Sequence, residues 1–265
     1  MQTFSAPALR LDTTNWHIEY DATTRRYLIR STHIHAAQIS WFDPEYWAQQ
    51  KAITGTTTGR GITYFIQYNG IAMVLREYLR GGVIAKFVKR HFWFNGLEHT
   101  RVYQEMALLD AMQQHGLNVP KPIGGLIQRC GVVYRNQILL ERISGAQDFH
   151  AHCQHDFVDN VHWQALGAEI AKMHQMGDYH HDLNTENVLL DNAGKVWLID
   201  FDKCKFMQPD PQWQIANLAR LARSIRKQRQ QHADYCINEA NWQAVLTSYS
   251  EQQKSIKLQH HTLYI

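Results

Sequence analysis

HHDLNTENVLLDNAGKVWLIDFD, residues 180–202, is the stretch of this chain that decides its fold. Three of its polar residues, Asp182, Asn187 and Asp200, have a characteristic spacing. Asn187 follows Asp182 by five positions, and Asp200 follows Asn187 by thirteen. Between Asn187 and Asp200 lie two short apolar runs and a turn rich in Asp, Asn and Gly, a pattern typical of a β-hairpin. A hairpin brings its two ends together, so we expect Asn187 and Asp200 to lie close to each other.

The oxygen atoms of these residues suit phosphoryl transfer from ATP. That reaction needs a carboxylate that orients the attacking hydroxyl and accepts its proton, and oxygen ligands that hold Mg²⁺ against the phosphates. Asp182 is the predicted catalytic residue, and Asn187 and Asp200 are the predicted metal ligands. The alternative is a buried hairpin whose acidic ends are solvated turns. We favour the catalytic interpretation because residue type, order and spacing agree.

The same residues resemble the protein-kinase-like superfamily, whose catalytic loop is HRDLxxxN and whose metal motif is DFG. The resemblance implies an α+β, two-lobed protein-kinase-like fold, with a β-rich N-lobe that holds one long helix and a mainly helical C-lobe. It also implies ATP and Mg²⁺ as cofactors. Asp202 stands where DFG has Gly, and it is predicted to be a further metal ligand, with a solvated turn residue as the alternative.

A β-hairpin is predicted in the first half of the chain around Asn69-Gly70, the favoured two-residue turn. Residues 63–68 and 71–75 on either side of it are aromatic, β-branched and apolar. Gly59 and Gly61 precede the first of these strands. By resemblance, they belong to a glycine-rich loop that covers the phosphates of the nucleotide.

The resemblance assigns four further positions to nucleotide binding. Arg76 ends the second strand where protein kinases have a Lys that grips the phosphates; Arg can bind phosphate bidentately but is not interchangeable with Lys. Glu105, on the following helix, is the expected ion-pair partner of Arg76. The alternative for both is a solvated surface charge. Residues 139–143 resemble the inter-lobe hinge, so the backbone groups of Glu141 and Ile143 are expected to bind adenine.

The apolar spacing predicts helices at residues 44–51, 98–115, 160–176, 212–227 and about 238–250. Asp43 is the predicted N-cap of the first helix, and Gly116 is predicted to end the second. Two strands are expected near residues 124–128 and 132–140. Together these elements divide the chain into an N-lobe, residues 1–143, and a C-lobe, residues 144–265.

The composition describes a folded protein in a reducing compartment. Of the 265 residues, 45% are hydrophobic and 19% charged, and the net charge of +3 does not predict a nucleic-acid partner. The four cysteines form no CxxC pair and are predicted to be free thiols. The sequence shows neither a signal-peptide pattern at its start nor an apolar run of membrane-spanning length. We therefore expect a protein that is cytoplasmic, or peripheral on the cytoplasmic side of a membrane.

Two features argue against a protein as the phosphoryl acceptor. Ten residues separate Asp202 from Trp213, where the next helix is expected, which is too short for a regulatory activation loop and a peptide platform. His181 also replaces the Arg that would bind a regulatory phosphate. A small-molecule or lipid-linked acceptor is therefore expected.

Three segments together carry a closer resemblance: VLREYLRGG at 74–82, GLNVPKP at 116–122 and HHDLN at 180–184. They look like the 3-deoxy-D-manno-octulosonic acid (Kdo) kinases of the lipopolysaccharide core kinase group. The resemblance implies ATP-dependent phosphorylation of the Kdo 4-hydroxyl on a lipid A precursor, at the inner membrane, with Asp182 as the general base. It implies no nucleic-acid partner and no obligate protein partner. The alternatives are another acceptor, such as a core heptose, and a pseudokinase that only binds nucleotide.

Basic and aromatic residues interleave in residues 84–97. From Arg76 to Arg101 the chain has six Lys or Arg residues against Glu77 and Glu98, a net charge of 6 − 2 = +4. Such a segment suits an anionic membrane surface, where each base contributes about 1 kcal/mol, so we expect peripheral contact with the inner membrane. The acidic acceptor would attract the same bases. The alternative is a helix that packs its aromatic residues on the N-lobe.

Several histidines are further candidates for metal ligands. His180 is expected instead to support the catalytic loop, and His174 is expected to pack inside its helix. His150, His152 and His155 are expected to lie in a loop, because no neighbouring carboxylate or Cys completes a known metal pattern.

Overall fold

The structure, a computed structural model, describes residues 10–32, 37–58, 61–80, 90–155, 158–253 and 265. The chain divides into two compact units. The sheet unit comprises Leu9–Ala111 and Pro120–Ile143, and the helical unit includes Met112–Val119 and Ser144–Ile265. The helical unit therefore contains a short segment from the first half of the sequence in addition to everything after Ile143.

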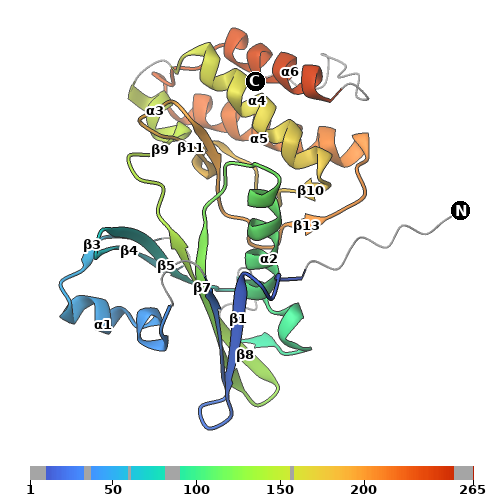
Figure 1. The fold of residues 1–265 in the computed structure, drawn as a ribbon. Helices are drawn as coiled ribbons and strands as arrows, with labels where there is room; N and C mark the ends of the chain where they lie inside the picture. The colour runs from blue at the N-terminus through green and yellow to red at the C-terminus, as the bar shows by residue number, and fades with distance from the viewer. Residues whose placement is uncertain (1–9, 33–36, 59–60, 81–89, 156–157, 254–264) are drawn as a thin grey trace, which may run out of the picture. The chain divides into compact units, whose positions relative to one another are not determined.

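An antiparallel sheet of eight strands forms the body of the sheet unit (Figure 1). Seven strands follow one another across the sheet, and a short eighth strand pairs with β8. Their order across the sheet is β1 (Trp16–Asp21), β2 (Arg26–Ser31), β7 (Pro122–Cys130), β8 (Val133–Glu141), β5 (Ile71–Glu77), β4 (Ile62–Tyr68) and β3 (Ile53–Thr58), with β6 (Phe92–Trp93) beside β8.

The hairpin predicted around Asn69-Gly70 is confirmed as β4 and β5. Asn69 has a φ of 48° and Gly70 a φ of 81°. Both values lie in the left-handed region that a type I′ turn requires, and Asn and Gly are the residues that enter it at least cost. The turn therefore fixes the register in which Thr63 faces Arg76.

Different helices cover the two faces of this sheet. On one face, η1 (Ile39–Phe42) and α1 (Pro44–Gln49) bring Trp41, Phe42 and Trp47 onto apolar residues of the sheet. On the other face lies α2 (Arg101–Gln114). A Cβ atom at Gly125 would come within 2.6 Å of Val102 in α2, whereas one at Gly124 would meet residues of the η1 side. The pair of glycines in β7 thus lets helices approach from both sides.

The helix ends predicted at Asp43 and Gly116 are confirmed. Asp43 caps α1 by accepting a hydrogen bond from the backbone N–H of Glu45. At the end of α2, Gly116 has a φ of 75°, its N–H donates to Gln113, and the N–H of Leu117 donates to Met112. This is the Schellman arrangement, in which a left-handed Gly lets the chain satisfy the last carbonyls of a helix.

In the described part of the helical unit, the main helices are α3 (Phe149–His155), α4 (Asn160–Gln175), α5 (Pro211–Gln231) and α6 (Glu239–Gln252). Helices α4 and α6 lie side by side (Figure 1), so closely that a Cβ atom at Gly167 would meet the carbonyl oxygen of Val245 at 2.2 Å. Short strands complete the unit: β9 (Gln147–Asp148), β11 (Val188–Leu190) and β12 (Val196–Leu198) pair in one sheet, and β10 (Asp178–Tyr179) pairs with β13 (Lys205–Phe206). Within the described ranges, no helix is long and apolar enough to cross a membrane.

The predicted α+β class is confirmed, with a β-rich first half and a mainly helical second half. The structure differs from the sequence analysis in one prediction, in one alternative and in several strands that were not predicted. The histidine-rich segment is the helix α3 rather than a loop, and β10, β13 and β9 add strands that were not predicted. In the basic and aromatic segment, residues 92–93 form strand β6 and not a helix, while residues 84–89 lie outside the described part of the chain.

Candidate active site

His180 fixes the start of the predicted catalytic loop. Its ring is fully buried, its Nδ1 accepts a hydrogen bond from the backbone N–H of Asp182 at 3.2 Å, and its Nε2 donates to the carbonyl of Ile199 at 3.0 Å. One nitrogen accepts while the other donates, so this is the neutral imidazole. Burial lowers the pKa of His180, which keeps the ring neutral. The imidazole thereby ties the loop to the end of β12.

The surroundings of His180 are equally fixed. Phe201 packs edge-on against the imidazole with ring centroids 4.8 Å apart, and Asn217 donates to the His180 carbonyl at 2.7 Å. Asn217 also contacts His174 at 3.0 Å, and burial lowers the pKa of His174 to about 4. The structure therefore confirms that His180 supports the loop and that His174 packs in the interior.

Asp182 presents its carboxylate to solvent from this fixed loop. Its side chain is 50% exposed, and one carboxylate oxygen accepts a hydrogen bond from Nη1 of Arg220 at 3.3 Å. The rest of the residue is held by its backbone, whose carbonyl accepts hydrogen bonds from Asn184 and Asn187. An accessible carboxylate with a restrained orientation is what proton transfer from an attacking hydroxyl requires.

Arg220 is a site residue that the sequence did not reveal. It lies on α5 together with Asn217 and Ser224, and all three contact the catalytic segment: Ser224 accepts a hydrogen bond from the backbone N–H of Thr185 at 3.4 Å. Their spacing of three and then four residues places them on one face of a helix. These three polar residues on one helix face were visible in the sequence. The sequence did not show which segment of the chain that face contacts.

The predicted metal ligand Asn187 is oriented by the same loop. Its amide nitrogen donates to the Asp182 carbonyl at 2.9 Å, which leaves the amide oxygen on the opposite side of the group. Upstream, the side chain of Asn184 accepts from the N–H groups of Glu186 and Asn187 and so caps the short helix η4 (Thr185–Asn187). Asn187 therefore turns an oxygen, and not a nitrogen, outward as a potential ligand.

Asp200 lies beside Asn187, as the hairpin predicted. The N–H of Ile199 donates to the carbonyl of Asn187 at 3.0 Å, so the residue after Ile199 is held next to that strand. Asp200 itself is exposed and has a φ of 64°, a conformation that few residues other than Gly adopt. A strained backbone at an exposed carboxylate is common at functional sites.

The oxygens of Asn187 and Asp200 fit a Mg²⁺ ion. Mg²⁺ is usually bound through one or two carboxylates together with waters and substrate phosphates. In keeping with this, the described residues contain no group of three or more His, Cys, Asp or Glu side chains that could hold a metal by themselves. Asp202 is half-buried in the following turn, and its role as a further ligand stays a prediction.

In the sheet unit, Arg76 and Glu105 form the predicted ion pair. The Glu105 side chain is only 2% exposed, and Tyr78 donates a hydrogen bond to its second carboxylate oxygen at 2.7 Å. The pairing excludes the alternative in which both charges are simply solvated. It ties β5 to α2 and sets the position of the Arg76 guanidinium, as a phosphate-binding group needs.

The remaining predicted nucleotide positions also belong to the sheet unit. Gly61 directly precedes β4, and a Cβ atom on Gly61 would meet Leu79 at 2.5 Å. Gly59 lies outside the described residues. Glu141 ends β8, and Ile143 follows it two residues later at the last position of the unit. Their binding roles stay predictions.

Comparison with known proteins adds an independent observation. A model of the lipopolysaccharide kinase (Kdo/WaaP) family matches residues 44–249. The chain belongs to this family. The match runs from α1 into α6 and thus includes the predicted catalytic loop, all three predicted metal ligands and the Arg76–Glu105 pair. Membership of the lipopolysaccharide kinase family identifies the chain as an enzyme of the kinase class and confirms the resemblance seen in the sequence.

Individual members of the lipopolysaccharide kinase family are similar over most of their length. The chain is 40% identical over 220 residues to the 3-deoxy-D-manno-octulosonic acid kinase of Vibrio vulnificus (strain YJ016), which covers 83% of this chain and 92% of that protein. It is 38% identical over 219 residues to the protein of the same name from Haemophilus influenzae (strain ATCC 51907 / DSM 11121 / KW20 / Rd), covering 80% and 90% of the two chains.

Proposed function

We propose that this protein transfers a phosphoryl group from ATP to the 4-hydroxyl of a Kdo residue on a lipid A precursor, in the biosynthesis of the lipopolysaccharide core. Its similarity to proteins named Kdo kinases supports Kdo as the acceptor. The single observation that carries the chemistry is the catalytic loop: the Asp182 carboxylate is accessible and held by Arg220, on a backbone that His180 fixes.

The residues divide the chemistry between them. Asp182 orients the sugar hydroxyl and accepts its proton as the new P–O bond forms, while the bond between the γ-phosphorus of ATP and its bridging oxygen breaks and ADP leaves. Asn187 and Asp200 would hold Mg²⁺, which neutralises charge on the phosphates when it is bound. Arg76, restrained by Glu105, would bind phosphate oxygens of the nucleotide. No covalent enzyme intermediate is required, because positioning and electrostatics supply most of the catalysis in phosphoryl transfer.

Transfer of radiolabel from [γ-³²P]ATP tests this proposal. Purified protein with Mg²⁺ is supplied with Kdo-lipid A precursor, with the same precursor lacking Kdo, and with a heptose-containing acceptor. Label should enter only the Kdo-containing lipid. Replacement of Asp182 by Asn should reduce kcat at least a hundredfold without changing the circular dichroism spectrum, because the carboxylate is lost while the size of the side chain is kept.

The other outcomes are equally informative. Label on the heptose acceptor alone would show that the acceptor is a different core sugar and not Kdo. ATP binding without transfer to any acceptor would support a pseudokinase, the remaining alternative. Full turnover in Asp182→Asn would remove Asp182 as the general base.

We further propose that the protein contacts the cytoplasmic face of the inner membrane peripherally. Trp93 and Val132 are 67% and 66% exposed, and the N–H of Phe94 donates to the Val132 carbonyl, so the two apolar side chains lie at the neighbouring ends of β6 and β8. Arg129 stacks on Phe94, and the side chain of Arg90 is 56% exposed. Exposed Trp with flanking bases is the composition that favours an anionic interface.

Flotation with vesicles tests this contact. The protein should float with vesicles that contain phosphatidylglycerol and not with neutral ones, and Trp93→Ser should reduce the bound fraction severalfold. Val161→Ser, which alters an equally exposed apolar residue of the other unit, serves as the control. If Trp93→Ser and Val161→Ser float to the same extent, the surface around Trp93 does not contact the membrane.

A further inference from the structure

A wide groove lies in the sheet unit, on the face of the sheet that α2 does not cover. It has a volume of about 1060 Å³, at the upper end of the range of small-molecule sites. Side chains alternate between the faces of a strand, so Leu75 and Glu77 of β5 and Leu126 and Gln128 of β7 point into the same groove. The described residues that line it all belong to the sheet unit.

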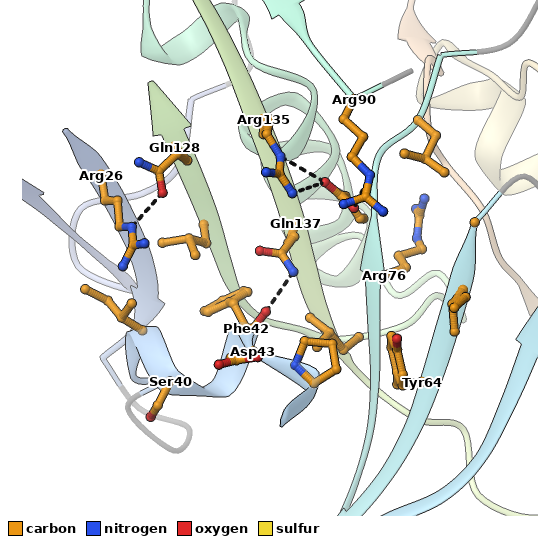
Figure 2. Close-up of a pocket in the computed structure, with 18 of the residues that line it drawn as sticks. Arg26, Ser40, Phe42, Asp43, Tyr64, Arg76, Arg90, Gln128, Arg135 and Gln137 are labelled. Carbon is orange, nitrogen blue, oxygen red and sulfur yellow. Dashed lines mark hydrogen bonds and ion pairs between the residues drawn. The ribbon is translucent and has the colours of Figure 1, made fainter. Parts of the chain in front are cut away.

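Arginines line one side of this groove (Figure 2). Arg135 donates to one oxygen of the Glu77 carboxylate at 3.0 Å, and Nε of Arg90 lies 3.5 Å from the other oxygen. Two guanidinium groups therefore share a single carboxylate. Arg26 donates to the neutral amide of Gln128 at 2.7 Å.

The lining carries a positive balance. It contains Arg26, Arg76, Arg90 and Arg135 against Asp43 and Glu77, which gives 4 − 2 = +2. Arg76 is compensated by Glu105 from outside the lining, which still leaves +1 for the groove. The Arg90 and Arg135 side chains are 56% and 41% exposed, so both guanidiniums are accessible to a ligand from solvent.

The rest of the lining is amphipathic. Tyr64 is half-buried and offers aromatic surface, and Ser40 and Gln137 offer a hydroxyl and an amide (Figure 2). The amide nitrogen of Gln137 donates to the Phe42 carbonyl at 2.7 Å, which fixes the orientation of this side chain in the groove. Aromatic surface next to oriented polar groups suits a ligand that has many hydroxyls on a rigid ring.

We propose that this groove is a second binding site, apart from the catalytic loop, for a saccharide that carries a phosphate or carboxylate. Gly61 and Arg76, two of the predicted nucleotide-binding residues, also belong to its lining. The guanidinium groups of Arg26, Arg90 and Arg135 bind the anionic group, since planar guanidinium matches the geometry of both phosphate and carboxylate. The aromatic and amide groups contact the sugar ring. Saccharide binding in this groove needs no ATP and no turnover, so it can be tested independently of the proposed kinase activity.

Calorimetry on the full chain without nucleotide tests the site with a matched set of sugars: glucose, glucose 6-phosphate and glucuronate, and with inorganic phosphate. At least one charged sugar should bind saturably, and glucose should not. Binding of glucose 6-phosphate assigns the anion as phosphate, and binding of glucuronate assigns it as carboxylate. Equal affinity for inorganic phosphate and for the charged sugars would overturn the saccharide part of the proposal.

Variants of the groove locate the binding. Arg26→Gln and Arg135→Gln should each weaken binding about tenfold or more, the loss expected for one charge-assisted contact. Arg30→Gln is the matched control, because Arg30 lies on the same strand as Arg26, pairs with Glu19 and does not line the groove. Unchanged affinity in Arg26→Gln and Arg135→Gln would place the ligand elsewhere and overturn the proposal.

A second measurement tests the site without any substitution, so its result does not depend on whether the variants fold. In the unaltered protein labelled with ¹⁵N-arginine, the Nε–H resonances of Arg26 and Arg135 should shift during titration with the charged sugar, and that of Arg30 should not. Resonances of Arg26 and Arg135 that stay in place while binding saturates would also overturn the proposal. Binding in Asp182→Asn should equal that of the unaltered protein, which separates this site from the catalytic loop.

Discussion

Asp178 is a buried carboxyl group four residues before the predicted base. It is fully buried, and neither of its oxygens accepts a hydrogen bond from any residue that the structure describes. Burial without compensation disfavours the charged form and raises the pKa of Asp178 to about 8. The side chain is therefore mostly protonated near neutral pH, and it links the stability of the catalytic segment to pH.

The contribution of Asp178 to the free energy of unfolding decreases as the pH rises. In the unfolded chain, Asp178 loses its proton near pH 3.8, the ordinary value for an Asp side chain, whereas the folded protein keeps the proton up to about pH 8. Its stabilising contribution is thus complete below pH 4 and is lost as pH rises to 8, by at most about 1.4 kcal/mol per pH unit. The free energy of unfolding of the wild type minus that of Asp178→Asn, both measured in urea, should therefore decrease between pH 5 and pH 8; taking this difference cancels the contributions of the other titrating groups, such as His174.

The exposed carboxylate of Asp234, in the same unit, provides the control: Asp234→Asn should unfold with the pH dependence of the wild type. If Asp178→Asn keeps the wild-type slope as well, Asp178 is ionised in the folded protein and its burial has another consequence.

Arg220 acts through Asp182 and is predicted to be a positioning residue. Loss of its 3.3 Å contact should let the carboxylate sample unproductive orientations, so Arg220→Ala should lower kcat about tenfold to a hundredfold with little change in the KM for ATP. Arg220→Lys should recover part of the loss. Steady-state phosphotransfer with Arg223→Ala, an exposed Arg on the same helix, is the comparison, and equal activity of the Arg220→Ala and Arg223→Ala variants would remove Arg220 from the site.

At the scale of elements, the Arg76–Glu105 pair joins strand β5 to helix α2. Arg76→Ala leaves the carboxylate of Glu105 buried without its cation and should reduce the free energy of unfolding by about 3 kcal/mol. Adding Glu105→Gln removes the charge and should restore at least half of that loss. Urea unfolding measures both effects.

The same pair of variants separates stability from binding. The double variant Arg76→Ala/Glu105→Gln should still bind nucleotide poorly despite its recovered stability, because the phosphate-binding cation is absent. Arg30→Ala breaks the more exposed Arg30–Glu19 pair and should cost less than about 1 kcal/mol. Wild-type nucleotide affinity in the double variant would contradict the role of Arg76.

Elements that are defined by local signals were predicted well. The Asn69-Gly70 turn, the Asp43 cap and the Gly116 helix end each depend on the conformational preference of one or two residues, and each was found as predicted. Strands such as β10 and β13 were missed because each has two residues, and such short strands exist only through pairing with a distant segment. The histidine-rich helix α3 was missed because its sequence lacks a clear apolar periodicity.

At the scale of the whole molecule, the predicted chemistry is distributed over the sequence. The general base and metal ligands come from the helical unit, and the phosphate-binding Arg76 comes from the sheet unit. In the part of the chain that is described, no cluster of side chains forms a closed metal site. Because Mg²⁺ is usually held by one or two carboxylates together with substrate phosphates, metal binding at Asn187 and Asp200 should depend on the nucleotide.

Removal of divalent metal tests this distribution. Excess EDTA should abolish phosphotransfer, and Mg²⁺ should restore it, while the melting temperature without nucleotide stays within about 1 °C. Addition of MgATP should raise the melting temperature, and Asp200→Asn should largely remove that increase. A large drop in melting temperature with EDTA alone would reveal a structural metal site.

The sequence by itself determined the reaction class, because Asp182, Asn187 and Asp200 lie in one continuous segment whose hairpin geometry follows from local turn chemistry. It also determined the α+β class and the pairing of Arg76 with Glu105 through the resemblance. Only the tertiary structure decided which groups surround them: Arg220 beside Asp182, Tyr78 on Glu105, and the arginine-lined groove on the sheet. Those contacts join residues far apart in the chain, and local preferences contain no information about which distant side chains meet.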